Sequence, residues 1–178
     1  AEELPRWLDP VRAAAESITV HELTRFMPPE DGDARRGAVL MVFADRDDVA
    51  DGAATPDDLA HRGELILTER AHHMRSQPGQ VSFPGGSLDE GETVVEGALR
   101  EAQEEIALDP GCVTVFGELP ELWLPPTNFA VTPVLGYWHD RRADLVESPD
   151  EVHAIHRVAI EELMDPEWRI NVRHPSGW

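Results

Sequence analysis

The sequence contains no lysine, and its 15 basic residues are all arginine. Without lysine the chain has neither a P-loop lysine nor an amine for Schiff-base catalysis, so both chemistries are excluded. Acidic residues number 35, which gives a formal net charge of −20 at pH 7. This charge argues against binding to DNA or RNA, and it repels phosphate-rich substrates unless local cations or a metal ion compensate.

Cysteine is also scarce, since Cys112 is the only one. One thiol cannot form an internal disulfide, which fits a reducing compartment and predicts a cytoplasmic location. Cys112 lies in an apolar run typical of a strand, so we interpret it as a small core residue and not as a nucleophile. No apolar run approaches the roughly 18 residues needed to span a bilayer, and residues 1–10 show no signal peptide, so no membrane partner is expected.

At 178 residues, 41% of them hydrophobic, the chain is expected to form a single domain over residues 1–178. Apolar or alternating runs predict strands at Ala38–Ala44, Glu64–Thr68, Cys112–Leu119, Phe129–Trp138 and Glu151–Ile160. Pro133 suggests that its strand lies at an edge or carries a bulge. Helices are predicted at Pro10–Ser17, with a strand or turn after it, and from Glu161 to Met164. Strands alternating with helices indicate an α/β sandwich with a mixed sheet.

The run from Gly85 to Leu108 predicts a tight glycine turn, an acidic loop and one long helix. Thr93 and Glu96 form a capping-box pattern, and Asp109-Pro110-Gly111 ends the helix. One face is apolar at helical spacing, formed by Val94, Val95, Ala98, Leu99, Ala102 and Ile106.

A second face of this helix carries Glu101, Glu104 and Glu105, at positions i, i+3 and i+4. Side chains at this spacing are neighbours, so the three like charges repel each other and a cation between them would remove the penalty. Carboxylate oxygens suit Mg²⁺ or Mn²⁺. Arg100 can pair with Glu104 or with Glu92 and so orient the carboxylates. For an isolated acidic helix, a simple solvated face is the alternative interpretation.

The spacing of these residues resembles the signature of the Nudix hydrolases. That signature is Gly, five residues, Glu, seven residues, Arg-Glu, an apolar residue, any residue, Glu-Glu, any residue, Gly and an apolar residue. The chain supplies Gly86, Glu92, Arg100, Glu101, Ala102, Glu104, Glu105 and Leu108 in order. It departs at Ala107, where the family has glycine, and we expect this to affect turn geometry more than chemistry. The resemblance implies a Nudix-type α/β/α sandwich with a mixed β-sheet and a diphosphatase that uses Mg²⁺ or Mn²⁺.

The resemblance also implies roles for individual residues. Glu101, Glu104, Glu105 and the backbone carbonyl of Gly85 are the expected metal ligands. Arg100 and Glu92 are expected to position them, with Arg100 counted among the catalytic group. The base that deprotonates the attacking water is either Glu104 itself or a downstream acid. The candidates for that acid are Glu118, Glu147, Asp150 and Glu151, and none is assigned.

The stretch before this signature narrows the resemblance. Its residues are Ile66-Leu67-Thr68, Arg70-Ala71, Arg75, Gly79 and Phe83-Pro84-Gly85-Gly86. They resemble the extra motif of the coenzyme A diphosphatase branch, whose members cut coenzyme A into phosphopantetheine and adenosine 3′,5′-bisphosphate. The motif implies that Arg70, Arg75 and Gly86 bind substrate, and guanidinium forks do suit phosphate oxygens. The alternative for the two arginines is pairing with Glu69 or Asp89.

Other residues in loops have weaker signals. His72 and His73 are adjacent and point in different directions, so we predict surface residues and no joint metal site. Trp123 can stack on an adenine base, although packing is an equally good interpretation. The stretch after Ile170 ends without a visible cap, where family members usually continue, so a truncated C-terminal end is expected.

Three functional hypotheses follow. The first is a metal-dependent diphosphatase of coenzyme A or its derivatives. The second is a Nudix enzyme for another nucleotide, such as ADP-ribose, NADH or a nucleoside triphosphate, for which loss of Arg70 or Arg75 would leave turnover unchanged. The third is a noncatalytic nucleotide-binding module. In each case the expected partner is a small molecule. A homodimer is an open alternative for the oligomeric state.

Overall fold

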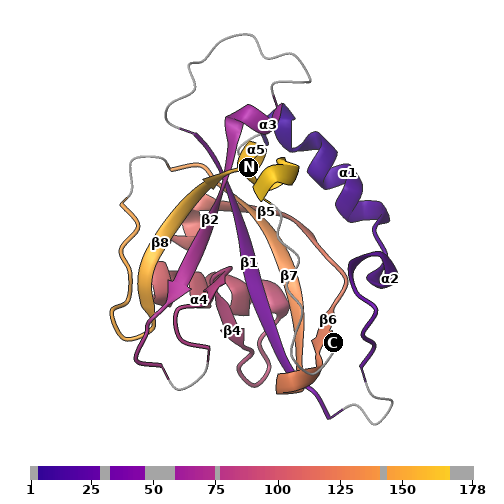
Figure 1. Ribbon diagram of the computed structural model, residues 1–178, viewed down its shortest axis with the longest axis vertical. Coiled ribbons are helices and arrows are strands. Elements are labelled where there is room, and N and C mark those ends of the chain that lie inside the picture. The colour runs from indigo at the N-terminus through magenta and orange to yellow at the C-terminus, as the bar shows by residue number, and fades with distance from the viewer. Residues whose placement is uncertain (1–3, 29–32, 47–58, 75–76, 141–143, 169–178) are drawn as a thin grey trace.

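A mixed sheet with helices against both faces forms the molecule in the computed structural model, which describes residues 4–28, 33–46, 59–74, 77–140 and 144–168 (Figure 1). The strands are β1 (Arg35–Asp45), β2 (Gly63–Arg70), β3 (Val81–Ser82), β4 (Gly85–Ser87), β5 (Val113–Glu118), β6 (Leu122–Leu124), β7 (Phe129–Trp138) and β8 (Val152–Ala159). The helices are α1 (Asp9–Ser17), α2 (Val20–Leu23), α3 (Leu59–Arg62), α4 (Val94–Ile106) and α5 (Ile160–Met164). No helix in these ranges combines the length and apolar character needed to cross a bilayer.

The strand order is β3-β2-β1-β7-β5, with β4 also paired to β1, β6 to β7 and β8 to β2. The central pair, β1 and β7, runs parallel, whereas the other pairings of described strands are antiparallel. Both faces of β1 are covered, which explains its continuous apolar run. The predicted α/β fold with a mixed sheet is therefore confirmed.

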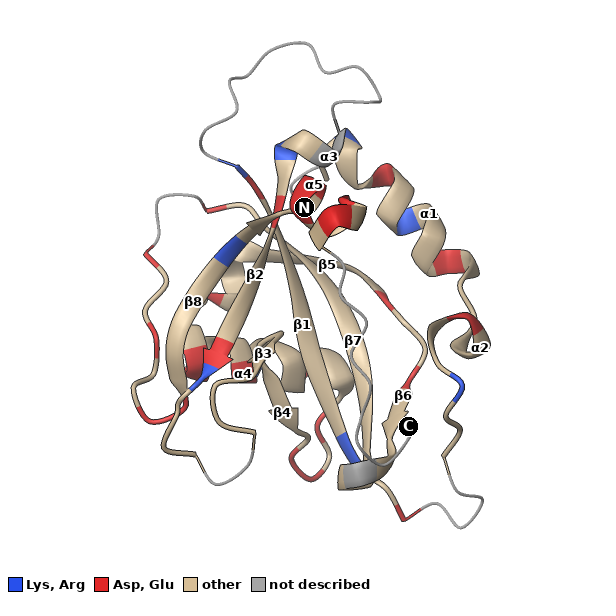
Figure 2. Cartoon of the chain, viewed as in Figure 1, with Lys and Arg blue, Asp and Glu red and all other residues tan. Residues whose placement is uncertain are grey.

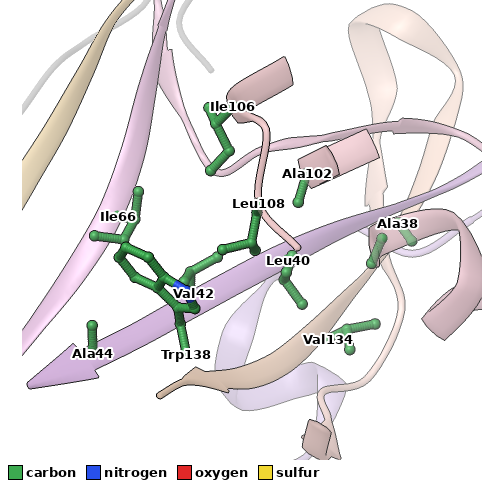
Figure 3. Close-up of a cluster of buried hydrophobic side chains, with 11 residues drawn as sticks. Ala38, Leu40, Val42, Ala44, Ile66, Ala102, Ile106, Leu108, Val134 and Trp138 are labelled. Atoms are coloured by element: carbon green, nitrogen blue, oxygen red, sulfur yellow. The ribbon is translucent and has the colours of Figure 1, made fainter. Parts of the chain in front are cut away.

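Side chains of β1 alternate between two cores, as a strand requires. Leu40 and Val42 belong to the core beneath α4, together with Ile106 and Trp138 (Figure 3). Phe43 belongs to the opposite core, against Trp7 and other residues of the N-terminal segment. Burying a side chain such as Leu40 completely stabilises the fold by roughly 1.5–3 kcal/mol.

β1 and β2 pair at one end only and diverge toward the other. The short strands β3 and β4, which lead to the candidate site, pair with them where they diverge. The two long strands pair only through residues 42–45 of β1 and 63–66 of β2. Farther along, β4 pairs with residues 37–39 of β1, while β3 pairs with residues 68–69 of β2. Pro84 lies between these two short strands, and its carbonyl accepts a hydrogen bond from the Leu40 amide at 2.8 Å. The glycine stretch that follows is thus a strand edge and not only the tight turn predicted.

Two other expectations need correction. Pro133 does not lie at an edge, because β7 is flanked by β1 on one side and by β5 and β6 on the other. Pro133 lies where the strand paired with β7 changes from β6 to β5. The backbone hydrogen bonding is interrupted there, so the N–H that proline lacks costs little. α2 occupies part of the segment where a strand or turn was expected, because Thr19 and Glu22 form a capping box.

Candidate active site

α4 is the element that positions the acidic side chains. The Thr93 hydroxyl accepts a hydrogen bond from the Glu96 amide at 3.2 Å, and the Glu96 carboxylate accepts one from the Thr93 amide at 2.9 Å. This capping box is the one predicted, and it fixes where the helix begins. Ala98 and Ala102 face the sheet and are fully buried. Because these residues are small, the helix packs close to the strands, and the neighbouring carboxylates therefore also lie near the sheet.

Glu105 is the most buried carboxylate of the helix, with 5% of its surface exposed. Its Oε2 accepts a hydrogen bond from the Gly85 amide at 3.1 Å, which ties the end of α4 to β4. Burial raises the pKa of Glu105 to about 7, although the Gly85 hydrogen bond acts in the opposite direction. The charges of Glu101 and Glu151 raise it further, while Arg70 lowers it.

Glu101 lies against Gly86 at the next position on the strand. A Cβ placed on Gly86 would come within 2.5 Å of the Glu101 carboxylate, so any other residue there would displace this carboxylate. Burial is also the main cause that raises the pKa of Glu101. The hydrogen bond from Arg100 Nη1, at 2.9 Å, partly offsets that effect. The observed contact gives Gly86 a role in shaping the site, and its binding to substrate stays a prediction.

Arg100 and Glu92 form a forked ion pair beside these carboxylates. Arg100 donates to the Glu92 carboxylate from Nε at 2.8 Å and from Nη2 at 3.0 Å. Nη2 also donates to the Ser87 carbonyl at 3.0 Å. The arginine is the first cause that lowers the pKa of Glu92. Of the two partners considered for Arg100, Glu92 is thus the closer one, since Glu104 lies 3.6 Å away.

Glu104 is the exposed member of the set, with 61% of its side chain accessible. It extends from the helix on the solvent side, whereas Glu101 and Glu105 turn toward β4. The helix therefore offers one buried carboxylate, one that is partly buried and one that is exposed.

Arg70, at the end of β2, is the cation that the structure brings to this cluster. Its charge lowers the pKa of Glu105, and its Nε is buried without a hydrogen-bond partner in the described part of the chain. A buried donor without a partner is costly, so this group is suited to a ligand oxygen. Arg75, the second predicted substrate-binding arginine, lies outside the described residues.

One of the four candidate bases is linked to the cluster electrostatically. The charge of Glu151 raises the pKa of both Glu101 and Glu105, and its backbone carbonyl accepts a hydrogen bond from the Ala71 amide at 2.9 Å.

Two further residues considered from the sequence have internal partners. Trp123 lies on β6, in a stretch where only a loop was predicted, and its indole N–H donates to the Asn128 side chain at 3.1 Å. Burial and the neighbouring Asp109 and Asp140 raise the pKa of the Cys112 thiol, which disfavours the reactive thiolate. The interpretation of Cys112 as a packing residue is consistent with its contact to the core beneath α4.

The acidic residues fit a divalent cation by their chemistry. Glu105 is buried and Glu101 partly buried, and burial is the main cause that raises the pKa of each; hard oxygen donors of this kind are suited to Mg²⁺ or Mn²⁺. Glu104 can join them because its side chain is exposed. The Gly85 carbonyl as a further ligand stays a prediction.

Sequence reasoning missed a second cluster, formed by Glu69, His72 and His153. His72 and His73 are exposed, as predicted, yet His72 meets residues of β2 and β8. The cluster forms because the polar ends of β2 and β8 lie side by side, and a single sequence does not reveal that these strands pair.

Comparison with known proteins shows to which family the chain belongs. The family described as NUDIX domain matches residues 51–176, more than half of the chain. Nudix hydrolase 3 of Caenorhabditis elegans is 43% identical over 105 residues, which cover 58% of this chain and 44% of that protein. The Nudix hydrolase NudL of Enterobacter sp. (strain 638) is 39% identical over 118 residues, which cover 62% of this chain and 55% of that protein. The chain spans about half the length of these curated relatives.

Solved structures show a related fold. RenU, a Nudix hydrolase from M. smegmatis, superimposes with a TM-score of 0.56 at 20% identity, over 77% of this chain and 80% of that chain. A C. elegans Ap4A hydrolase binary complex gives a TM-score of 0.54 at 19% identity, over 72% and 83% of the two chains.

Proposed function

The chain belongs to the Nudix hydrolase family, and on that premise we propose that it hydrolyses the diphosphate bond of coenzyme A or its derivatives. The products would be 4′-phosphopantetheine and adenosine 3′,5′-bisphosphate. The observation that carries the proposal is that Arg70, whose Nε has no hydrogen-bond partner among the described residues, lies near enough for its charge to lower the pKa of Glu105, which the Gly85 amide holds. In this proposal a carboxylate donor for a cation and a guanidinium for phosphate act at the same point of the sheet.

Mg²⁺ or Mn²⁺ would be held by Glu101, Glu104 and Glu105, with the Gly85 carbonyl as a further ligand. When bound, such an ion neutralises charge on the diphosphate and lowers the pKa of a coordinated water.

The protein groups have distinct tasks in the proposed reaction. Arg70 binds a phosphate oxygen and stabilises the negative charge that develops as the anhydride bond breaks. Arg100, fixed by Glu92, holds the Glu101 carboxylate in place through its Nη1 hydrogen bond. The base that accepts the proton from the attacking water is Glu104 or Glu151. Glu104 is exposed, while Glu151 already acts electrostatically on Glu101 and Glu105.

Substrate choice in this proposal rests on the stretch that joins β2 to β4. Its resemblance to the coenzyme A diphosphatase motif covers Ile66 to Gly86, and the structure describes all of it except residues 75–76. Arg70 lies at the start of the connection and Gly86 at its end. Gly86 lies against Glu101 and Arg70 acts on Glu105, which supports the proposal that the motif and the acidic helix act as one site.

The test is product identification by mass spectrometry after incubation of the protein with coenzyme A and Mn²⁺ or Mg²⁺. We expect phosphopantetheine and adenosine bisphosphate, with rates reduced on the order of 10²–10³-fold in Glu104→Gln and Glu105→Gln. Glu16→Gln, an exposed carboxylate on α1, is the matched control and should keep full activity.

Two outcomes would contradict the proposal. Turnover of ADP-ribose, NADH or a nucleoside triphosphate with coenzyme A left intact would move the substrate to another nucleotide. Tight binding of coenzyme A without cleavage of any of these compounds would indicate a noncatalytic binding module.

A further inference from the structure

A cluster of histidine and carboxylate side chains lies away from the carboxylates of α4. Glu69 is on β2, His72 is in the turn that follows, and His153 is on β8. One ligand atom from each of the three lies within 4.8 Å of the other two. Ile66 of β2 packs beneath α4 whereas Leu65 packs on the Trp7 side. Since alternate residues share a face, Glu69 stands on the same side as Leu65 and faces away from α4.

The side chains are already held near one another. His72 Nε2 lies 3.2 Å from Glu69 Oε1, and the His72 and His153 rings meet edge to face with centroids 4.4 Å apart. Gly79 supports the His72 ring, because a Cβ at Gly79 would come within 2.9 Å of it. The ring therefore packs against the backbone of the opposite side of the turn.

A fourth residue orients the carboxylate. His156 Nε2 lies 3.0 Å from Glu69 Oε2, so one oxygen is engaged and the other faces His72. This hydrogen bond is the first cause that lowers the pKa of Glu69, and the charges of His153 and His72 act in the same direction. An ionised carboxylate held by an outer partner is the usual arrangement behind a metal ligand.

We propose that Glu69, His72 and His153 bind a transition-metal ion of the Zn²⁺ type, at a site separate from that of the catalytic ion. Two imidazoles and one carboxylate suit zinc and its neighbours in the periodic table, whereas Mg²⁺ prefers oxygen donors alone. In tetrahedral coordination the ligand atoms are about 3.3 Å apart, so the side chains need to approach by roughly 1.5 Å at most. His72 is 61% exposed and Glu69 22% exposed, which leaves room for that movement and for a water molecule as fourth ligand.

The surroundings favour a cation at this position. The described surface carries acidic residues on many elements and few basic ones (Figure 2), in keeping with the net charge of −20. The bound ion would connect the turn after β2 to β8. Arg70 lies directly next to Glu69 with its side chain on the other face, so the ion would also restrain the backbone that carries Arg70. This inference does not depend on which substrate the enzyme hydrolyses.

The experiment uses untagged protein that carries Glu104→Gln and Glu105→Gln, so that the carboxylates of α4 do not compete for the ion. Zn²⁺ is titrated calorimetrically, and Co²⁺ is used as a spectroscopic probe because tetrahedral Co²⁺ absorbs far more strongly than hexahydrated Co²⁺. We expect one Zn²⁺ per chain, with affinity reduced tenfold or more by His72→Gln and, separately, by His153→Gln. His73→Gln, the exposed neighbour outside the cluster, is the matched control and should bind as before.

Circular dichroism without metal establishes that each variant is folded, and the two histidine variants report independently. Absence of Zn²⁺ binding by the double glutamine protein would overturn the proposal. Equal affinities in His72→Gln, His153→Gln and His73→Gln would overturn it as well, since the ion would then bind elsewhere.

Discussion

Arg100 and Glu92 are joined by two parallel hydrogen bonds, at 2.8 Å from Nε and 3.0 Å from Nη2. The same guanidinium reaches the Glu101 carboxylate through Nη1. One side chain thus connects the loop before α4 to a partly buried carboxylate of the helix. Only a planar fork makes these contacts together, and an ammonium group does not.

Arg100→Lys should therefore lower activity although it keeps the charge. We expect kcat/KM to fall by roughly 10–100-fold, because Glu101 loses its fixed orientation. Steady-state kinetics with coenzyme A measure this effect. Arg12→Lys, at an exposed pair with Asp9 on α1, should leave the rate unchanged. Equal rates for Arg100→Lys and the unmodified protein would show that the fork has no positioning role.

Gly86→Ala should disturb the site from the strand side. The added methyl group would occupy space 2.5 Å from the Glu101 carboxylate and so displace it. We expect an activity loss on the order of 10²-fold, with weaker binding of Mn²⁺ measured by electron paramagnetic resonance. Ser87→Ala, at the next and exposed position of β4, is the control. Normal Mn²⁺ affinity in Gly86→Ala would contradict the close approach described.

The metal-free protein should lose stability as the pH rises from about 5 to about 8. The pKa of Glu105 is raised from 4.5 to about 7 by burial. Between these values the folded protein holds a proton that the unfolded chain has released, so the stabilising contribution is complete below pH 4.5 and lost through pH 7. The upper limit is about 3 kcal/mol, from 1.36 kcal/mol per pKa unit.

Urea unfolding in the presence of a chelator, at several pH values, measures this dependence. Glu105→Gln keeps an acceptor for the Gly85 amide but does not titrate. The difference in unfolding free energy between the two proteins should therefore change with pH in the stated direction. A difference that stays constant over the range would refute the assignment to Glu105.

Ala107→Gly should stabilise the protein. Ala107 ends α4 in the left-handed region, with φ of 55° and ψ of 27°, where a Cβ is unfavourable. Removing the methyl group should raise the unfolding free energy by about 1 kcal/mol, with little change in activity. Ala102→Gly, in the buried interior of the same helix, should act in the opposite direction by at least about 1 kcal/mol. Thermal or urea unfolding of both variants decides the matter, and a destabilised Ala107→Gly would contradict the cap.

The sequence predicted best what depends on neighbouring residues. The start of α4 was located by Thr93 and Glu96, and its end was placed just before Asp109-Pro110-Gly111, close to the observed last residue Ile106, because these signals are local chemistry. Five strands were also located from apolar runs, with ends that differ by a few residues. Ala107 lies at the helical cap, so the departure from the family pattern is at the turn, and its effect on chemistry stays a prediction.

What the sequence did not show depends on distant partners. β6 was taken for part of a loop because it has only three residues and acquires its hydrogen bonds from β7. For Pro133 the edge alternative was wrong, because nothing in its own strand reveals that β7 is central, whereas the pairing of β7 with β5 does have a register shift close by. The cluster around Glu69 combines β2, a turn and β8, so it exists only once those segments have come together.

The parallel pairing of β1 with β7 also has a consequence for how the chain is made. Phe43 lies beside Tyr137, so the centre of the sheet closes only after most of the chain has left the ribosome. Until then the edge of β1 that pairs with β7 has no partner, and an unpaired apolar strand is prone to aggregation. Because such pairings join distant parts of the sequence, refolding is expected on the slower, millisecond-to-second scale of non-local topologies. Stopped-flow tryptophan fluorescence, to which Trp138 at the end of β7 contributes as one of five tryptophans, would follow the event.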